Sequence, residues 1–366
     1  MNTQCLKIDL RDGSSYRIYV GEGLLAGIGE QVAQLVKGKK ACIITDSVVG
    51  PLYLSLIHES LKQAGFTVFD LVIPAGEQSK DINVAQELWL ACAEQGLGRD
   101  GVICALGGGV VGDLAGFVAS TYMRGVPCVQ IPTSLLAMVD SSIGGKTGIN
   151  LQAGKNIIGT FAQPVLVAID LAVLETLPAS EWDNGFAEIA KSALVDGDDF
   201  YTWLVEHVKD LRNQEKAVVQ EAIVRSLAFK GRVVAADERE SGMRECLNYG
   251  HTFGHALEAV AGYGAISHGK AVAAGMRFAA QLAREAVDAP PKIAKKQNAL
   301  LDALGLPDLQ EVYPVDELFD RIRADKKVRD NEARFVFVTA PGKWQTVAVN
   351  LDLLKIHLIL WAEARM

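Results

Sequence analysis

The 366-residue chain is predicted to combine an α/β N-terminal Rossmann-like domain with a mainly α-helical C-terminal domain. Short runs rich in Val and Ile alternate with helical patterns over the first half, which indicates a mostly parallel, doubly wound sheet. One of these runs leads into a glycine-rich loop. From about Pro178, long windows with helical spacing of apolar residues take over. We therefore expect two domains, residues 1–177 and 178–366.

Seven segments of the first half have the composition of strands and are bounded by Gly, Pro or Asp. They are Cys5–Leu10, Tyr16–Val20, Ala41–Asp46, Phe66–Ile73, Val102–Leu106, Cys128–Pro132 and Val165–Asp170. The first two lie close together, which predicts an antiparallel hairpin. Apolar residues at helical spacing predict helices at Leu24–Val36, Pro51–Ala64 and Val84–Gln95.

The second half contains mostly helical windows. They are Ser180–Val195, Asp199–Val208, Glu215–Ala236, Leu247–Ala261, Gly269–Ala286, Ala294–Leu304 and Val315–Asp325. In this half, strand patterns occur at Arg334–Thr339 and Gln345–Val349, joined by a turn at Ala340-Pro-Gly-Lys.

Composition excludes several classes of protein. With 49% hydrophobic and 22% charged residues, the chain is neither disordered nor fibrous. Its net charge of −8 disfavours a nucleic-acid partner. We find no secretory signal and no uncharged apolar stretch of membrane-spanning length. The six cysteines are scattered without a C-x-x-C pair, so we expect a cytoplasmic protein without a membrane partner.

The loop Gly107–Asp113 satisfies G-x-G-x-x-G between a strand and an apolar helix. Glycines let the backbone approach a pyrophosphate at a helix N-terminus, so the loop predicts a dinucleotide site. The alternative is a tight turn with close helix–strand packing. Asp46 ends an earlier strand, where it could bind a ribose or cap a helix. Gly76–Lys80 could be a second ligand loop or a plain polar turn.

Histidines point to a metal site. His251 and His255 are four residues apart, on one face of a predicted helix, and Arg244 and Asn248 extend that face. Thr252 stands where a zinc protease would carry its glutamate. His268 begins the next predicted helix, and Glu188 lies on an earlier one. Glu188 and two of the histidines could form a catalytic Zn²⁺ site of one Glu and two His. Hydrogen-bonded histidines in a helical core are the alternative.

Lysines flanked by glycines suit a phosphorylated substrate, because an ammonium group can approach a phosphate there with little hindrance. Each cation taken alone is more typical of a solvated surface charge. The cations concerned are Arg124, Lys146, Lys155, Lys230, Arg244 and the pair Lys326–Lys327.

Taken together, these motifs resemble the 3-dehydroquinate synthase family of sugar phosphate cyclases. The matching segments follow the family's order along most of the chain: Gly107–Asp113, Gln130–Ser134, Val139–Lys146, Gly154–Asn156, Gly185–Lys191, Leu247–His255 and His268-Gly269. The resemblance implies a homodimeric, NAD-dependent enzyme that also needs Zn²⁺ or Co²⁺. It would act on a small phosphorylated keto acid, converting 3-deoxy-D-arabino-heptulosonate 7-phosphate to 3-dehydroquinate and phosphate in the shikimate pathway.

The resemblance also assigns roles by motif match. The metal ligands would be Glu188, His251 and His268. NAD would contact Asp46, Glu77, Lys80, Gly109, Val110, Val111, Gly112, Asp113, Thr133, Ser134, Lys146, Lys155 and Thr176. Substrate binding and catalysis would use Asp140, Lys146, Asn156, Lys191, Lys230, Arg244, Asn248, His255 and Lys326, with Arg124 reaching across the dimer interface. Lys327 could replace Lys326.

The implied chemistry accounts for these residue types. NAD would oxidise one hydroxyl, phosphate would leave, the hydride would return, and ring opening and an aldol step would close the new ring. Lys146, Asn156 and Arg124 would hold the phosphate, Lys230 and Arg244 the carboxylate, and His255 would move a proton. Lys270 stands where many members carry Glu, and Ser134 replaces a frequent Thr.

Three other functions remain as alternatives. A polyol dehydrogenase of the glycerol type shares the architecture but needs neither the lysine set nor Arg244. Another sugar phosphate cyclase would take a substrate such as sedoheptulose 7-phosphate. A non-catalytic NAD-binding protein would not depend on Glu188 or His268.

Overall fold

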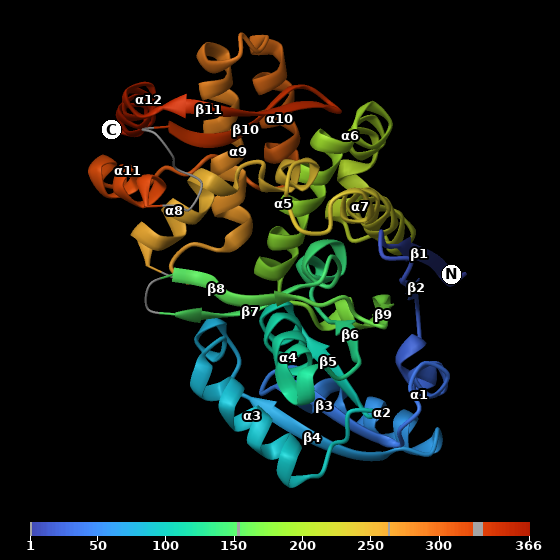
Figure 1. Ribbon diagram of the computed structural model, residues 1–366. Coiled ribbons are helices and arrows are strands. Elements are labelled where there is room, and N and C mark those ends of the chain that lie inside the picture. Colours follow the sequence, from blue (N-terminus) through green and yellow to red (C-terminus); the bar gives the residue numbers. More distant parts are fainter. Residues whose placement is uncertain (1, 152–153, 263, 325–331) are drawn as a thin grey trace. The chain divides into compact units, whose positions relative to one another are not determined.

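A computed structural model describes residues 2–151, 154–262, 264–324 and 332–366 (Figure 1). The chain divides into two compact units. The first comprises Met1–Pro178 together with Lys230–Arg239, and the second comprises Ala179–Phe229 and Glu240–Met366. The segment from Lys230 thus groups with the first unit, although a long helix connects it to the second.

A seven-stranded sheet forms the centre of the first unit, in the order β1-β2-β9-β6-β5-β3-β4. Its strands are β1 (Gln4–Asp9), β2 (Ser15–Gly21), β3 (Lys40–Asp46), β4 (Thr67–Ile73), β5 (Val102–Gly107), β6 (Cys128–Pro132) and β9 (Leu166–Asp170). Only β1 and β2 pair antiparallel in this sheet; its other neighbours are parallel. This confirms the predicted Rossmann-like sheet and its N-terminal hairpin.

Helices and short turns connect these strands. They are η1 (Leu24–Gly27), α1 (Ile28–Ala33), α2 (Gly50–Gln63), η2 (Glu77–Ser79), α3 (Ile82–Glu94), α4 (Gly109–Thr121), η3 (Tyr122–Arg124), η4 (Ala137–Ser141) and η5 (Leu171–Thr176). A buried core joins β3 and β5 to α3 and α4, with Leu88 and Leu114 among its members. Three thiols, those of Cys42, Cys92 and Cys128, lie in the same core.

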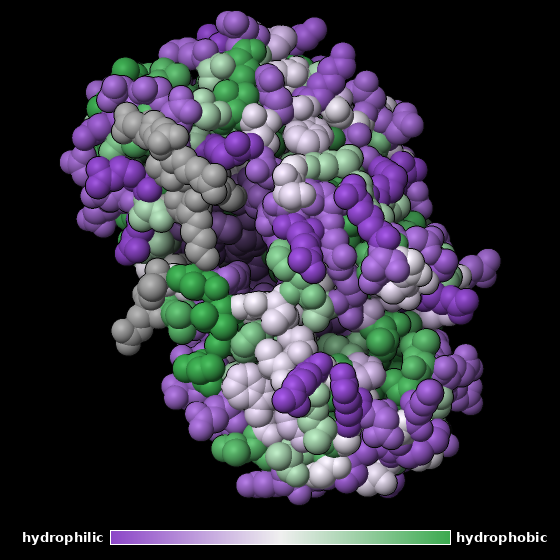
Figure 2. Space-filling view, viewed as in Figure 1, coloured by the Kyte–Doolittle hydropathy of each residue, from purple (hydrophilic) through white to green (hydrophobic). Residues whose placement is uncertain are grey.

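A two-stranded hairpin, β7 (Lys146–Leu151) with β8 (Gly154–Phe161), was not predicted (Figure 1). The glycines in its sequence are more typical of a loop than of strands. In the structure they allow the backbones of the two strands to approach closely. A Cβ on Gly159 would lie 2.3 Å from the Thr147 carbonyl oxygen, and one on Gly148 would lie 2.6 Å from that of Ile158. Large apolar side chains on the hairpin are exposed, including Ile158 and Phe161, and Figure 2 shows a green patch where Figure 1 places the hairpin.

The second unit is mainly helical, as predicted. Its elements are α5 (Ala179–Asp196), α6 (Asp198–Arg212), α7 (Lys216–Ala236), η6 (Met243–Asn248), α8 (His251–Ala261), α9 (His268–Ala286), α10 (Pro291–Ala303), α11 (Val315–Arg323), β10 (Glu332–Ala340), β11 (Lys343–Asn350) and α12 (Leu351–Glu363). The end of α7, from Lys230, groups with the first unit. The sequence did not predict α12. Aromatic rings join α8 to α9 and α12, because Phe253 stacks on Phe278 at 4.4 Å and meets Trp361 at 5.1 Å.

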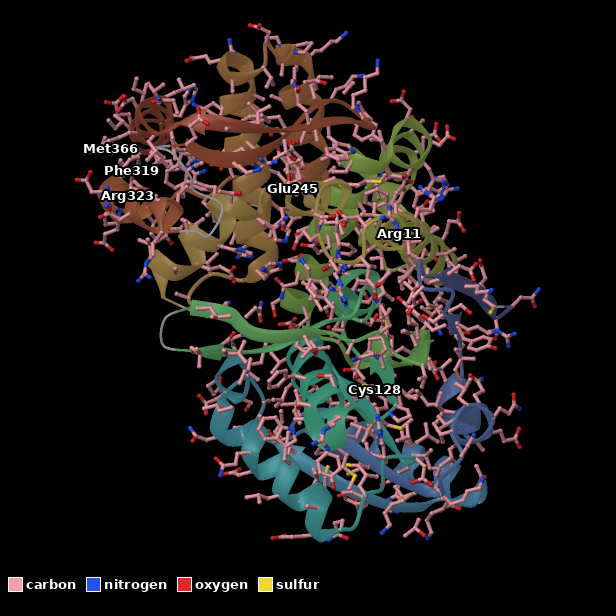
Figure 3. All side chains as sticks on the ribbon, viewed as in Figure 1. Arg11, Cys128, Glu245, Phe319, Arg323 and Met366 are labelled. Carbon is pink, nitrogen blue, oxygen red and sulfur yellow. The ribbon has the colours of Figure 1, made fainter. Side chains whose placement is uncertain are left out.

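One predicted helix of this unit is wrong in its extent. The window Leu247–Ala261 was expected to be continuous with Arg244, but the α-helix begins at His251. Gly250, with φ +80°, separates it from the 3₁₀ turn η6, since a left-handed residue interrupts a helix. Figure 3 labels Glu245 in η6, whose carboxylate pairs with Arg334 of β10 at 2.8 Å.

Over the described residues, none of the helices combines the length and apolar character that crossing a membrane requires.

Candidate functional site

The residues predicted to bind NAD follow the carboxyl ends of parallel strands in the first unit. β3 and β5 are neighbours, with Thr45 opposite Leu106, and Gly107 of β5 lies opposite Pro132 of β6. Asp46, Gly107 and Thr133 therefore lie at the same end of the sheet. The chain passes from β3 outward to β4 and then returns to β5 on the other side. This is a topological switch point, where open α/β sheets bind ligands.

The glycine loop leads directly into α4, whose first residues are Gly109–Asp113 with Val110 and Val111 among them. Packing favours glycine at position 107, because a Cβ there would lie 2.6 Å from Val111 Cβ. A Cβ on Gly112 would lie 2.9 Å from Gln130 Oε1, so the end of that side chain would have to shift. Gly108 differs, because its φ is −73° and a Cβ would meet Ser134 Oγ at an ordinary 3.4 Å. The free N–H groups of the first turn make this end suitable for an anion.

Polar side chains beside this loop form one hydrogen-bonded network. Lys80 is buried, and its Nζ donates to Asp113 Oδ2 at 2.7 Å and to Asn156 Oδ1 at 2.5 Å. The Asn150 amide donates to Glu77 Oε1 at 2.7 Å and accepts from the Asn156 backbone N–H at 2.9 Å. The network links the predicted NAD residues to the β7–β8 hairpin. Asn156, predicted to hold phosphate, therefore contacts Lys80.

Electrostatics within this network have opposing effects. Burial raises the pKa of Asp113, although the adjacent Lys80 ammonium acts to lower it. The buried Lys80 ammonium lies between a carboxylate and an amide oxygen. These partners offset the free-energy cost of removing its charge from water.

The remaining predicted NAD residues have local partners. Asp46 Oδ1 accepts from the backbone N–H groups of Val48 and Val49, at 2.8 and 2.9 Å, so it tethers the turn that leads into α2. Thr133 and Ser134 are buried after β6. Thr176 lies at the end of η5 and shares a 2.6 Å hydrogen bond with the Tyr53 hydroxyl.

The predicted substrate residues of the first unit include one ion pair. Lys230 Nζ donates to the carbonyl oxygen of Asp140 at 2.8 Å and to its Oδ1 at 2.9 Å. Arg124 ends η3 with φ +64°. Lys146 begins β7 and Lys155 follows the first residue of β8.

In the second unit, three side chains from three helices converge. Glu188 of α5, His251 of α8 and His268 of α9 each offer a ligand atom, all within 4.8 Å of one another. Glu188 Oε1 lies 3.5 Å from His251 Nε2 and 3.4 Å from His268 Nε2. Lys191, one turn after Glu188 on α5, pairs with the other carboxylate oxygen, and both side chains are only 2% exposed.

Both imidazoles are oriented through their second nitrogen. His251 Nδ1 lies 3.1 Å from the carbonyl oxygen of Tyr249, and His268 Nδ1 lies 3.5 Å from Glu258 Oε2. Metal-ligating histidines characteristically have such partners. Neither Tyr249 nor Glu258 is among the predicted site residues. Tyr249 lies within the matching segment Leu247–His255, and Glu258 lies one helical turn after His255 on the same helix.

The pKa values of the three proposed ligands shift in different directions. Burial and Lys191 lower the pKa of His251 well below its ordinary value. Burial opposes ionisation of Glu188, but Lys191 and the two imidazoles prevail and hold its pKa well below the usual range. Burial also acts to lower the pKa of His268, whereas Glu188 and Glu258 raise it to about 9. These shifts favour the carboxylate of Glu188 and the neutral imidazole of His251, the forms that metal ligation requires, whereas His268 must lose its proton before it can bind a metal.

The geometry also fits a metal ion. Ligands about 2.0–2.1 Å from a tetrahedral Zn²⁺ are separated by about 3.4 Å. The two Glu188–histidine distances are 3.5 and 3.4 Å, and the donor set of one carboxylate and two imidazoles leaves a further position open.

The other predicted residues of this unit lie close to the three ligands in sequence. The His255 ring centroid is 5.2 Å from that of His251 and 6.3 Å from that of His268. Asn248 donates to Glu240 Oε1 at 2.8 Å, and Arg244 is buried in η6. Because Gly250 breaks the helix, Arg244 and Asn248 do not continue the helical face of His251 and His255, contrary to the prediction. Lys326 and Lys327 lie outside the described residues.

The fold agrees with solved structures. 2-epi-5-epi-valiolone synthase from Streptomyces hygroscopicus subsp. jinggangensis 5008, with NAD⁺ and Zn²⁺ bound, superposes with a TM-score of 0.86 and 28% identity over 96% of this chain and 98% of that one. A 2-deoxy-scyllo-inosose synthase gives 0.84 at 24% identity, over 97% and 99%. A probable glycerol dehydrogenase from Sinorhizobium meliloti 1021 gives 0.67 at 16%, over 95% and 96%.

Sequence relatives are more specific. Residues 70–184 match the family model of the 3-dehydroquinate synthase N-terminal region, and residues 185–328 match that of the C-terminal region. A 3-dehydroquinate synthase from Acidithiobacillus ferrooxidans is 42% identical over 342 residues, 93% of each chain. One from Latilactobacillus sakei subsp. sakei is 44% identical over 328 residues, 90% of each. The chain belongs to the 3-dehydroquinate synthase family.

Proposed function

We propose that the chain catalyses the 3-dehydroquinate synthase reaction, in which 3-deoxy-D-arabino-heptulosonate 7-phosphate gives 3-dehydroquinate and phosphate. The observation that carries this proposal is the set of Glu188, His251 and His268, in which the buried carboxylate of Glu188 is also paired with Lys191. Burying a carboxylate and an ammonium group costs folding free energy, so a chain that keeps this pair beside the metal ligands is expected to use it. The two relatives at 42% and 44% identity are named 3-dehydroquinate synthase.

The two units would divide the work. The first, at the carboxyl end of its sheet, would bind NAD, and the second would bind Zn²⁺ or Co²⁺ through Glu188, His251 and His268. When bound, the metal would acidify a substrate hydroxyl and NAD would accept and return a hydride. Glu188 would supply the anionic ligand, while Lys191 would balance its charge and offer donors to substrate oxygens. The roles of the other predicted substrate residues stay predictions.

The deciding experiment is a substrate panel. Purified protein with NAD and Zn²⁺ or Co²⁺ should release inorganic phosphate from the heptulosonate phosphate without net formation of NADH. Net NADH from glycerol without phosphate release would instead identify a polyol dehydrogenase, the alternative that the glycerol dehydrogenase fold neighbour keeps in view. Faster turnover of sedoheptulose 7-phosphate would identify a different cyclase, and no turnover of any substrate would favour a binding protein.

Gly108→Ala tests the NAD loop, because the fold has room for the new methyl group. We expect NAD affinity to fall at least about tenfold, since a Cβ there would meet a pyrophosphate that approaches the backbone. Thermal unfolding should stay close to that of the wild type. Calorimetric titration with NAD measures the affinity, and an unchanged value would mean that the loop is only a tight turn.

We further propose a cytoplasmic homodimer in which Arg124 completes the partner's site. Its six cysteines are all free thiols, which suits a reducing compartment. Arg124→Ala and Lys191→Ala chains should each be inactive, yet their co-expression should restore activity, because one site of each mixed dimer would be intact. Random pairing predicts recovery of about a quarter of the wild-type rate. If Arg124 instead serves its own chain, mixing will restore nothing.

A further inference from the structure

Two buried polar side chains, Tyr249 and Gln297, form a hydrogen-bonded relay in the second unit. Both are fully buried. The Tyr249 hydroxyl hydrogen-bonds to Gln297 Oε1, and Gln297 Nε2 donates to the carbonyl oxygen of Met276 in α9 at 2.9 Å. A carbonyl can only accept, so the amide nitrogen must face Met276. The amide oxygen then faces Tyr249, which must be the donor.

The relay ends at a predicted metal ligand. The carbonyl oxygen of Tyr249 lies 3.1 Å from His251 Nδ1, and since a carbonyl has no proton, the imidazole must carry its proton there. This tautomer leaves the Nε2 lone pair available, and Nε2 is the atom 3.5 Å from Glu188 Oε1. The position of the Tyr249 carbonyl therefore sets both the tautomer and the orientation of the ligand.

Local backbone geometry alone does not fix that carbonyl. Tyr249 lies between the 3₁₀ turn η6 and α8, followed by Gly250 with φ +80°. Glycine has the widest range of backbone conformations, so the junction needs contacts from outside the segment to hold one of them. Gln297, on α10, provides such a contact by joining the Tyr249 side chain to the body of α9, the helix that begins with His268.

We infer that Gln297 is a positioning residue for the metal: acting through Tyr249, it holds His251 in the orientation and tautomer that ligation needs. Neither residue is one of the three proposed ligands, and the sequence motifs indicate neither role. The inference rests on the proposed function in one respect, that Glu188, His251 and His268 bind Zn²⁺ or Co²⁺.

The test compares Gln297→Leu and Tyr249→Phe with the wild-type chain. Zn²⁺ affinity is measured by competition with a chromophoric chelator, and coordination by the visible absorption of the Co²⁺-loaded protein. Each variant should bind Zn²⁺ about 10- to 100-fold more weakly, which is the usual effect of removing the partner of a ligand. The double variant should be no weaker than either single one, because the two residues act as one unit.

Arg277→Met provides a matched control. Arg277 also joins α9 to the end of α10, through Asp302 at 2.6 Å and the Leu306 carbonyl at 2.8 Å, without contacting Tyr249. The Arg277→Met substitution should lower the melting temperature but leave the Zn²⁺ affinity and the visible spectrum of the Co²⁺-loaded protein unchanged. Equal losses of affinity in Arg277→Met and Gln297→Leu would overturn the inference, as would unchanged affinity in Gln297→Leu. A wild-type chain that binds no metal would contradict the proposed function itself.

Discussion

Glu188→Gln should abolish metal binding and lower kcat/KM by at least about a thousandfold, since the metal contributes several kcal/mol of charge stabilisation in such reactions. Glu188 provides the carboxylate that both imidazoles face, at 3.4 and 3.5 Å. An amide keeps the shape but loses the charge. Metal content after dialysis and steady-state phosphate release would measure the two effects. Glu206→Gln, an exposed glutamate on the neighbouring helix α6, provides the control and should change neither.

The same substitution should also destabilise the metal-free protein, because the buried Lys191 ammonium would lose the carboxylate charge that pairs with it. Breaking a buried pair in this way typically costs about 3–5 kcal/mol. Replacing both residues, as Glu188→Gln with Lys191→Met, should recover most of that stability while activity stays absent. If Glu188→Gln retains metal and turnover, Glu188 is a structural partner of Lys191 and the proposed site is wrong.

Gly275→Ala is also expected to have a large effect on folding. A Cβ at this position of α9 would lie 1.9 Å from the carbonyl oxygen of Gly250, and Gly250 comes directly before His251. Backbone atoms cannot move aside as a flexible side chain can, so α8 and α9 must separate. We expect a loss of about 3 kcal/mol in the free energy of unfolding, together with weaker metal binding.

Denaturant titration of Gly275→Ala measures the stability, and chelator competition measures the metal. Gly27→Ala is the matched control: its φ is −109° and a Cβ would meet nothing within 4 Å, so its stability should change little. An unfolding free energy for Gly275→Ala within about 0.5 kcal/mol of the wild type would show that the contact between the two helices can relax.

The sequence predicts the sheet well because its strands are short, apolar and punctuated by Gly, Pro and Asp, which are local signals. It misses the β7–β8 hairpin for the opposite reason. Gly148 and Gly159 weaken the strand pattern, yet the contact that needs them is between two separate segments. The periodicity of Arg244, Asn248, His251 and His255 is likewise consistent with a helix, but the left-handed conformation of Gly250 interrupts it.

The site shows the same limit. Spacing suggests that His251 and His255 share a face, whereas only the fold brings Glu188, His251 and His268 together from three helices. Of the partners of these ligands, Tyr249 lies within the matching segment Leu247–His255, but its residue type does not indicate that its carbonyl oxygen accepts from an imidazole; Glu258 lies outside the segment. Gln297 is harder still to select from the sequence. A glutamine on an amphipathic helix normally faces solvent, and nothing in the sequence indicates that this one is buried.

The buried cysteines can be used to measure local unfolding of each unit. Cys42, Cys92, Cys104 and Cys128 are all shielded within the first unit, and Cys246 is shielded within the second. A thiol reagent can reach them only when the surrounding structure opens, so their modification rates would report the opening free energy of each unit separately. Cys5, which is exposed, would react at once and serve as the reference within the same molecule.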